Sequence, residues 1–201
     1  MTNRPFWVKQ LDKAWEKRTL VWLSGVRRSG KTTLCKMIPD AVYLNCDLPS
    51  VGRQLENPEY YYRNLLPGST VIFDEIHRIQ DPSLVLKIGV DEFPDLKVLA
   101  TGSSVLAATK KFRDSLTGRK VQLFLPPVLW NECIDDFTMP DLTRRLHQGG
   151  LPEFLLDDRK QEELFSEYCH AGDSRNRGNG RGEVGDRSAE KDSYVLAEYR
   201  L

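Results

Sequence analysis

The sequence lacks the features that mark several large classes of protein. Its four cysteines form no C-x-x-C pair, which favours reduced thiols over a disulfide framework or a structural zinc site. No apolar run approaches the ~20 residues that cross a membrane, and charged side chains interrupt the amino-terminal stretch where a signal peptide would have its apolar core. These absences predict a cytoplasmic protein that does not contact a membrane.

The chain also lacks an excess of charge of either sign. Lysine and arginine total 29, aspartate and glutamate total 29, and the formal net charge is zero. No overall field therefore draws the chain to nucleic acid, and binding of that kind would have to be local. A guanine-reading N-K-x-D motif is missing as well, which argues against a GTPase.

What the sequence does contain is a run of glycine, lysine and hydroxyl residues after an apolar stretch. Residues 20–23 predict a buried strand, and residues 25–33 read G-V-R-R-S-G-K-T-T, which matches the phosphate-binding pattern G-x-x-x-x-G-K-[ST]. A helix is predicted over 31–38. The candidate phosphate-binding residues are Gly25, Val26, Arg27, Arg28, Ser29, Gly30, Lys31, Thr32 and Thr33.

Each part of this loop has a chemical reason for its residue type. The two glycines let backbone N–H groups approach a polyanion, and the start of the helix adds the positive end of its dipole. Lys31 supplies a full charge for the β- and γ-phosphates, and the Thr32 hydroxyl is placed to ligate Mg²⁺. For Arg27 and Arg28, contact with phosphate and simple exposure to solvent both remain open. The opposing interpretation is a glycine turn followed by a surface lysine.

A second candidate element is the apolar strand predicted over residues 70–73, which ends in Asp74 and Glu75. Parallel strands present their carboxyl ends at one edge of the sheet, so this pair is expected beside the loop. Asp74 then holds Mg²⁺, and Glu75 is the catalytic group that orients and deprotonates an attacking water. Taken alone, two acids in this position would more often cap the next helix.

Two further polar groups accompany later strands. Thr101 follows the strand predicted at 97–100, where a hydroxyl can act as a sensor of the γ-phosphate or the lytic water; the equal alternative is a turn and helix N-cap. Arg119 precedes the strand predicted at 121–125 and can stabilise the transferred phosphoryl group, in its own subunit or in a neighbour's. The basic cluster around it is otherwise expected to be a solvated face, and His77 is expected to be a polar strand exit or a coupling residue.

Strand and helix signals alternate along most of the chain. Strands are predicted over 20–23, 41–45, 70–73, 97–100 and 121–125, and helices over 5–17, 31–38, 58–66, 82–93, 105–116, 129–137 and 142–146. This alternation predicts a parallel sheet covered on both faces, and with the loop at 25–33 it predicts an α/β P-loop NTPase fold, a three-layer α/β/α sandwich with a mainly parallel five-stranded sheet. Three regions are expected: a core at 1–128, a small helical lid-like segment at 129–170, and a Gly- and charge-rich, poorly ordered tail at 171–201.

Together these motifs resemble a family of prokaryotic AAA+-like ATPases. The matching runs are L-S-G-V-R-R-S-G-K-T-T-L, Y-L-N-C-D, V-I-F-D-E-I-H-R-I, K-V-L-A-T-G-S-S, L-T-G-R and G-G-L-P-E. The resemblance implies ATP at 25–33, Mg²⁺ at Thr32 and Asp74, catalysis at Glu75 and a sensor at 101–104. In that family a C-terminal domain of unknown function normally follows the core, whereas here the pattern ends early, as in a truncated or divergent chain.

The leading functional expectation is a Mg²⁺-dependent ATPase whose hydrolysis moves the helical segment. One alternative is a nucleotide-dependent switch that hydrolyses little because its C-terminal domain is missing. A helicase and a small-molecule kinase are weaker alternatives, since the chain is short for the two domains of a helicase and the paired acids favour water as acceptor. The expected partners are ATP and, where an arginine acts in trans, a second copy of the chain; the net charge does not indicate nucleic acid.

Overall fold

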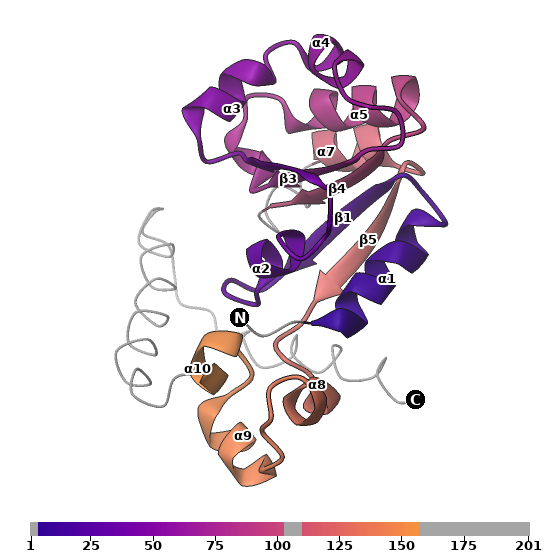
Figure 1. Ribbon diagram of the computed structural model, residues 1–201. Coiled ribbons are helices and arrows are strands. Elements are labelled where there is room, and N and C mark those ends of the chain that lie inside the picture. Colours follow the sequence, from indigo (N-terminus) through magenta and orange to yellow (C-terminus); the bar gives the residue numbers. More distant parts are fainter. Residues whose placement is uncertain (1–3, 103–109, 157–201) are drawn as a thin grey trace, which may run out of the picture. The chain divides into compact units, whose positions relative to one another are not determined.

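A parallel sheet forms the centre of the computed structural model, which describes residues 4–102 and 110–156. Within those residues the sheet has five strands in the order β2-β3-β4-β1-β5, and every neighbouring pair is parallel (Figure 1). The strands are β1 (Leu20–Gly25), β2 (Val42–Asn45), β3 (Thr70–Asp74), β4 (Lys97–Thr101) and β5 (Lys120–Leu125). The predicted parallel, five-stranded sheet is confirmed.

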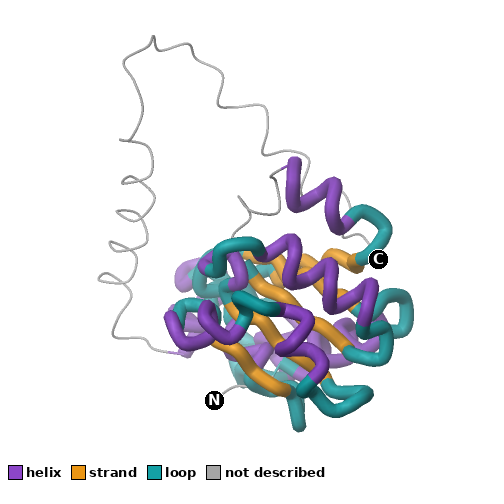
Figure 2. The backbone as a smooth tube through the Cα atoms, turned by 90° about the horizontal axis from the view of Figure 1, so that it is seen from above, coloured by secondary structure: helices purple, strands orange, loops and turns teal. Residues whose placement is uncertain are grey.

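Helices cover both faces of this sheet, which gives the predicted three layers (Figure 2). They are α1 (Pro5–Trp15), α2 (Lys31–Cys35), α3 (Pro49–Gln54), α4 (Pro58–Arg63), the 3-10 helix η1 (Ile76–Arg78), α5 (Pro82–Glu92), α7 (Lys110–Leu116), α8 (Trp130–Asp135), α9 (Leu142–Gln148) and α10 (Pro152–Leu156). Among residues 4–102 and 110–156, no helix has the length and apolar character needed to cross a membrane.

The strand β1 shows why the layers form, because its side chains are buried on both faces. Leu20 and Trp22 belong to a core shared with α4, α5 and α7, whereas Val21 and Leu23 belong to a second core shared with α1 and α2. All four side chains are fully buried. Alternate residues of a strand point to opposite faces, so an unbroken apolar run is what a doubly covered strand requires.

Two helices differ from the predictions in informative ways. The helix α3 was not predicted, because Gly52 lowers helix propensity, although Pro49 at its first position is a helix-start signal. The helix predicted over 31–38 ends as α2 at Cys35, after which the chain continues in turns. Of the helix predicted over 105–116, the part before Lys110 lies outside the described residues.

The helical addition predicted after the last strand is present as α8, α9 and α10. Its small apolar cluster consists of Val128, Cys133, Phe137, Met139 and Leu155. A backbone hydrogen bond from the Val128 N–H to the Gly150 carbonyl (2.7 Å) joins the stretch before α8 to the turn between α9 and α10. The predicted tail at 171–201 and the segment at 157–170 lie outside the described residues.

Two glycines in helices offer a matched test of the packing between α4 and α5. A Cβ on Gly89 would lie 2.6 Å from the hydroxyl oxygen of Tyr62, whereas a Cβ on Gly52 would meet no atom within 4 Å. Tyr62 is fully buried against Phe73 and Phe93 and has little room to move. Gly89→Ala should therefore lower the free energy of unfolding by about 1–3 kcal/mol.

Gly52→Ala is the control, and it should raise the free energy of unfolding by about 0.4–1 kcal/mol because it removes backbone freedom from the unfolded chain. Urea titration followed by circular dichroism measures both changes. Equal stability of the two variants would contradict the packing described for Tyr62.

Candidate functional site

The carboxyl ends of three strands lie side by side at one edge of the sheet. The strand β4 is inserted between β1 and β3, and Thr101 at its end pairs in register with Leu23 of β1. On the other side, Ala100 of β4 pairs with Phe73 of β3, so Asp74 follows directly beside Thr101. The topology therefore brings the loop after β1, the two acids after β3 and Thr101 to a common place, as the order of motifs predicts.

The loop between β1 and α2 depends on glycine at both of its ends. A Cβ on Gly25 would overlap the carbonyl oxygen of Leu125 on the neighbouring strand, so no larger residue fits without a shift of the backbone. Gly30 has a φ of 91°, a left-handed conformation that side chains disfavour. Between them Arg28 also has a positive φ, 64°, which is unusual for a residue other than glycine. The loop thus follows a constrained path that a larger residue at position 25 or 30 would disturb.

Lys31 folds back over this loop. Its Nζ donates hydrogen bonds to the carbonyl oxygens of Gly25 (3.1 Å) and Val26 (2.9 Å). Burial lowers the pKa of Lys31, while the nearby charges of Glu75 and Asp74 oppose that shift. The ammonium group therefore lies within electrostatic range of both acids, and its hydrogen bonds are to neutral carbonyls that an anion can replace.

Asp74 is buried, and hydroxyl groups from two neighbouring strands hold its carboxylate. Thr101 Oγ1 donates to Oδ1 at 2.6 Å, and the Tyr43 hydroxyl on β2 donates to Oδ2 at 2.7 Å. Burial and the hydrogen bond to Asp74 both raise the pKa of Tyr43, so its hydroxyl keeps its proton at neutral pH. Sequence reasoning did not find Tyr43, because an isolated tyrosine in a strand carries no motif.

Glu75 adopts a left-handed backbone conformation, with a φ of 56°. Its N–H donates to Thr101 Oγ1 at 2.9 Å, and its Oε2 lies 3.1 Å from His77 Nδ1. Although Glu75 stands at the N-cap of η1, its side chain makes no capping hydrogen bond. The Glu75 side chain is 35% exposed, so it faces the open edge of the sheet.

The remaining loop residues divide between buried and exposed positions. Ser29 is fully buried, and its Oγ has no hydrogen-bond partner among the described residues. Thr32 and Arg27 are exposed, and Val26 and Thr33 are partly buried. Arg28 Nη1 lies 3.5 Å from Glu153 Oε2 on α10, an ion pair that the loop pattern did not predict.

Arg119 lies away from this group. It precedes Lys120, which pairs with Leu20 at the start of β1, whereas Gly25 of the loop pairs with Leu125 at the end of β5. At about 3.3 Å per residue, the strand separates Arg119 from the loop by roughly 20 Å. Its guanidinium instead binds Asp91, with Nε–Oδ1 and Nη2–Oδ2 distances of 2.7 and 3.1 Å. Contact between Arg119 and a phosphate on the loop of the same chain does not fit this geometry.

The residues present fit a phosphorylated ligand with Mg²⁺. Among the described residues, the Ser29 hydroxyl is buried without a partner and Lys31 donates only to carbonyls, and both groups are suited to phosphate oxygens. Mg²⁺ in nucleotide sites commonly keeps several waters and takes one or two protein oxygens plus phosphate oxygens. The Thr32 hydroxyl and the Asp74 carboxylate are such oxygens. Within residues 4–102 and 110–156, no cluster of three or more His, Cys, Asp or Glu could hold a metal.

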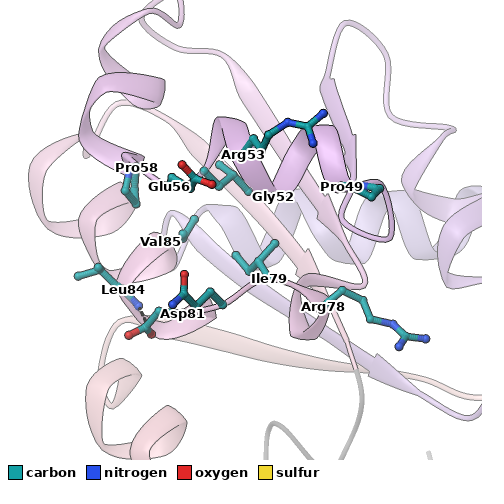
Figure 3. Close-up of a pocket in the computed structure, with 12 residues that line it drawn as sticks. Pro49, Gly52, Arg53, Glu56, Pro58, Arg78, Ile79, Asp81, Leu84 and Val85 are labelled. Carbon is teal, nitrogen blue, oxygen red and sulfur yellow. Dashed lines mark hydrogen bonds between the residues drawn. The ribbon is translucent and has the colours of Figure 1, made fainter.

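A separate cavity of about 750 Å³ lies among α3, α4, η1 and the start of α5 (Figure 3). Buried side chains of Leu55, Ile79 and Val85 form part of its lining, and Arg53 and Arg78 extend from its wall. None of the lining residues belongs to the loop at 25–33 or to the acids after β3. The cavity is therefore distinct from the candidate site.

The sheet order, the loop and the paired acids define an AAA+-like P-loop ATPase fold. A family model described as an AAA domain matches residues 17–134, which is more than half of the chain, and the chain belongs to that family. No curated protein matches the sequence.

Solved structures agree on the fold. The Walker-type ATPase of Pyrococcus abyssi matches with a TM-score of 0.61 at 14% identity, over 88% of this chain and 76% of that one. The Orc1 protein of Aeropyrum pernix, solved in complex with DNA, matches with a TM-score of 0.53 at 13% identity, over 90% and 63%. The RuvB Holliday junction branch migration motor of Thermotoga maritima matches with a TM-score of 0.52 at 15% identity, over 85% and 64%. At these sequence identities the likeness shows the fold alone. This chain spans less than two thirds of the length of the Orc1 and RuvB proteins.

Replacing Thr101 tests whether its hydroxyl holds the strand ends together. Thr101→Val keeps the shape of the side chain but leaves the buried Asp74 carboxylate and the Glu75 N–H without this partner. The free energy of unfolding should fall by about 1–3 kcal/mol, the usual cost of a buried unsatisfied polar group. Thr101→Ser, which keeps the hydroxyl, should lose much less in the same urea titration. Equal losses would show that the methyl group, not the hydroxyl, is what matters at this position.

Proposed function

We propose that the chain binds ATP with Mg²⁺ at the loop of residues 25–33 and hydrolyses it. One observation supports this most directly: Lys31, Asp74 and Glu75 interact electrostatically at one sheet edge, beside a glycine-bounded loop. A Mg²⁺–triphosphate complex presents anionic phosphates and a cation together, and a lysine close to two carboxylates offers a partner for each.

In this proposal the loop binds the phosphates through its backbone and through Lys31. Lys31 leaves the carbonyl oxygens of Gly25 and Val26 for the β- and γ-phosphate oxygens, a hydrogen bond between full charges that is stronger than one to a neutral acceptor. The buried Ser29 hydroxyl gains an acceptor or donor that it lacks among the described residues. The exposed Thr32 lies at the open side of the same turn.

Thr32 and Asp74 would hold the Mg²⁺ ion, which when bound neutralises charge on the phosphate oxygens. The hydroxyls of Thr101 and Tyr43 fix the orientation of the Asp74 carboxylate and leave its remaining lone pairs for a metal-bound water. Glu75 orients the attacking water and accepts its proton, a role that its exposed carboxylate and its place after Asp74 suit. Thr101 binds the Asp74 carboxylate and the Glu75 N–H, and it is the sensor candidate because its strand lies between β3 and the strand that precedes the loop.

A nucleotide-dependent switch with little hydrolysis is the second candidate, and two contacts favour it. Glu75 is engaged by His77, and Arg119 is bound to Asp91 at the far edge of the sheet. In a single chain the carboxylate of Glu75, the proposed catalytic base, is therefore already paired with His77, and Arg119 does not reach the loop. An arginine supplied in trans would require the far edge of one copy to face the loop of the next, which is a head-to-tail contact that builds rings or filaments.

We propose a cytoplasmic setting because Cys35, Cys46 and Cys133, the cysteines among residues 4–102 and 110–156, are buried and form no disulfide there. Two of the structural neighbours have DNA or a Holliday junction in their names, and these describe what is known of those two proteins. With a formal charge of zero, this chain offers no overall attraction for nucleic acid, and we propose none as a partner.

Lys31→Ala tests the binding of the phosphates. Its loss removes one full charge from the loop, and the ATP dissociation constant should rise about 100-fold, as for a lost charge-assisted hydrogen bond pair. Isothermal titration calorimetry measures the change, with Lys13→Ala, an exposed lysine of α1, as the control. Unchanged affinity in the Lys31 variant would place the nucleotide elsewhere.

Glu75→Gln separates binding from hydrolysis. ATP affinity should stay within about twofold, while steady-state phosphate release should fall about 100-fold or more, the range for loss of a general base. Glu92→Gln, at the exposed end of α5, is the matched control. Equal phosphate release by the Glu75 variant would remove this residue from the mechanism. ATP binding without release by the unaltered protein would favour the switch.

A further inference from the structure

Arg4 is a buried arginine that joins the loop at 25–33 to the helical addition. Its side chain is 2% exposed. Nη1 donates to the Ser29 carbonyl oxygen at 2.8 Å, while Nε and Nη2 donate to the two carboxylate oxygens of Glu132 at 2.7 and 2.8 Å. Arg4 precedes the segment matched by the family model, and Glu132 is 128 residues away in the chain, so no local motif links them.

The positive charge of Arg4 is neutralised by the carboxylate of Glu132, so Arg4 is not expected to bind a phosphate through its charge. Burial by itself would raise the pKa of Glu132, but hydrogen bonds from Arg4, from the Leu129 N–H (2.9 Å) and from Trp7 Nε1 (3.3 Å) hold it below its usual value. The carboxylate therefore stays ionised while fully buried. Because the Arg4–Glu132 pair is neutral overall, the distinctive contact of Arg4 is the one with the Ser29 carbonyl.

That contact fixes a peptide plane inside the loop. In a planar trans peptide the carbonyl and the following N–H point in opposite directions. Arg4 holds the Ser29 carbonyl on its own side, so the Gly30 N–H is directed to the other side of the loop. Gly30, with a φ of 91°, has no side chain that restricts the orientation of this peptide plane. The hydrogen bond from Arg4 to the Ser29 carbonyl supplies that restriction.

The same stretch of loop contacts α10. A Cβ on Gly30 would lie 3.7 Å from Pro152 Cγ and 3.9 Å from Arg4 Nη1, so both groups pack against the loop there. One residue further on, Glu153 pairs with Arg28 of the loop. The fully buried Ser29 Oγ has no partner among the described residues, which independently indicates a polar ligand for this turn.

We propose that Arg4 is a positioning residue for phosphate binding: by holding the Ser29 carbonyl, it directs the Gly30 N–H toward the phosphates and clamps the loop against α8 and α10. The inference rests on the proposed function, since it concerns how the same loop binds a polyphosphate. Arg4 does not touch the ligand. A buried ion pair is weak support for stability as such, so its specific effect should appear in affinity rather than only in unfolding.

The test removes the donor without leaving a buried charge. Arg4→Met combined with Glu132→Gln replaces both charged groups by uncharged ones, and the glutamine carbonyl can still accept hydrogen bonds from Leu129 and Trp7. Calorimetry well below the unfolding midpoint should show the dissociation constants of ATP and of inorganic tripolyphosphate raised about tenfold, the effect of losing one hydrogen bond that orders the site. If this variant does not fold, Arg4→Met with Glu132→Leu replaces it.

Arg18→Met is the matched control, because Arg18 donates to another carbonyl, that of Gly118, at 3.0 Å on an exposed surface. It should leave both dissociation constants unchanged. If the unaltered protein binds ATP and the Arg4 variant binds both ligands equally well, the positioning role is overturned while the proposed function stands. If the unaltered protein binds neither ligand, the proposed function itself fails.

Discussion

The hydroxyl group of Thr101 is the point on which the candidate site depends. It donates to the Asp74 carboxylate and accepts from the Glu75 N–H, so a single side chain on β4 holds both the last residue of β3 and the residue that follows it. This is possible because β4 lies between β3 and β1 in a parallel sheet, which places the ends of all three strands at one edge. Lys31 then completes the group from the loop after β1, within electrostatic range of both carboxylates. The order of the strands thus decides which residues meet at this edge, and the hydrogen bonds of Thr101 hold Asp74 and Glu75 in place there.

The strands and the order of the motifs were predictable because both follow from short-range patterns. An unbroken apolar run such as residues 20–23 indicates a strand covered on both faces, and the glycine-lysine pattern after it indicates a loop open to anions. The helix α3 is not evident from the sequence, because the low helix propensity of the glycine in its middle counts against a helix more than the proline at its start counts for one. In each of these cases the deciding information lies within about ten residues, which is the range of sequence patterns of this kind.

The contacts that could not be predicted are those made across the fold. Tyr43 reaches Asp74 from another strand, and Arg4 reaches Glu132 over 128 residues. Nothing in their local sequence distinguishes these side chains from ordinary surface ones. Arg119 shows the reverse case: its sequence suits a catalytic arginine, but the direction of β5 places it at the opposite end of the sheet from the loop. Motifs therefore indicate which groups exist, and strand direction decides which of them meet.

The central claim is that a nucleoside triphosphate binds at the loop of residues 25–33. The most direct measurement is a titration of the ¹⁵N-labelled protein with ATP and Mg²⁺, followed by the chemical shifts of its backbone amides. The account predicts saturable shifts that are largest for the amides from Ser29 to Thr33, with little change at Asp91 and Arg119. Largest shifts at the cavity among α3, α4 and α5, with unmoved loop amides, would contradict it.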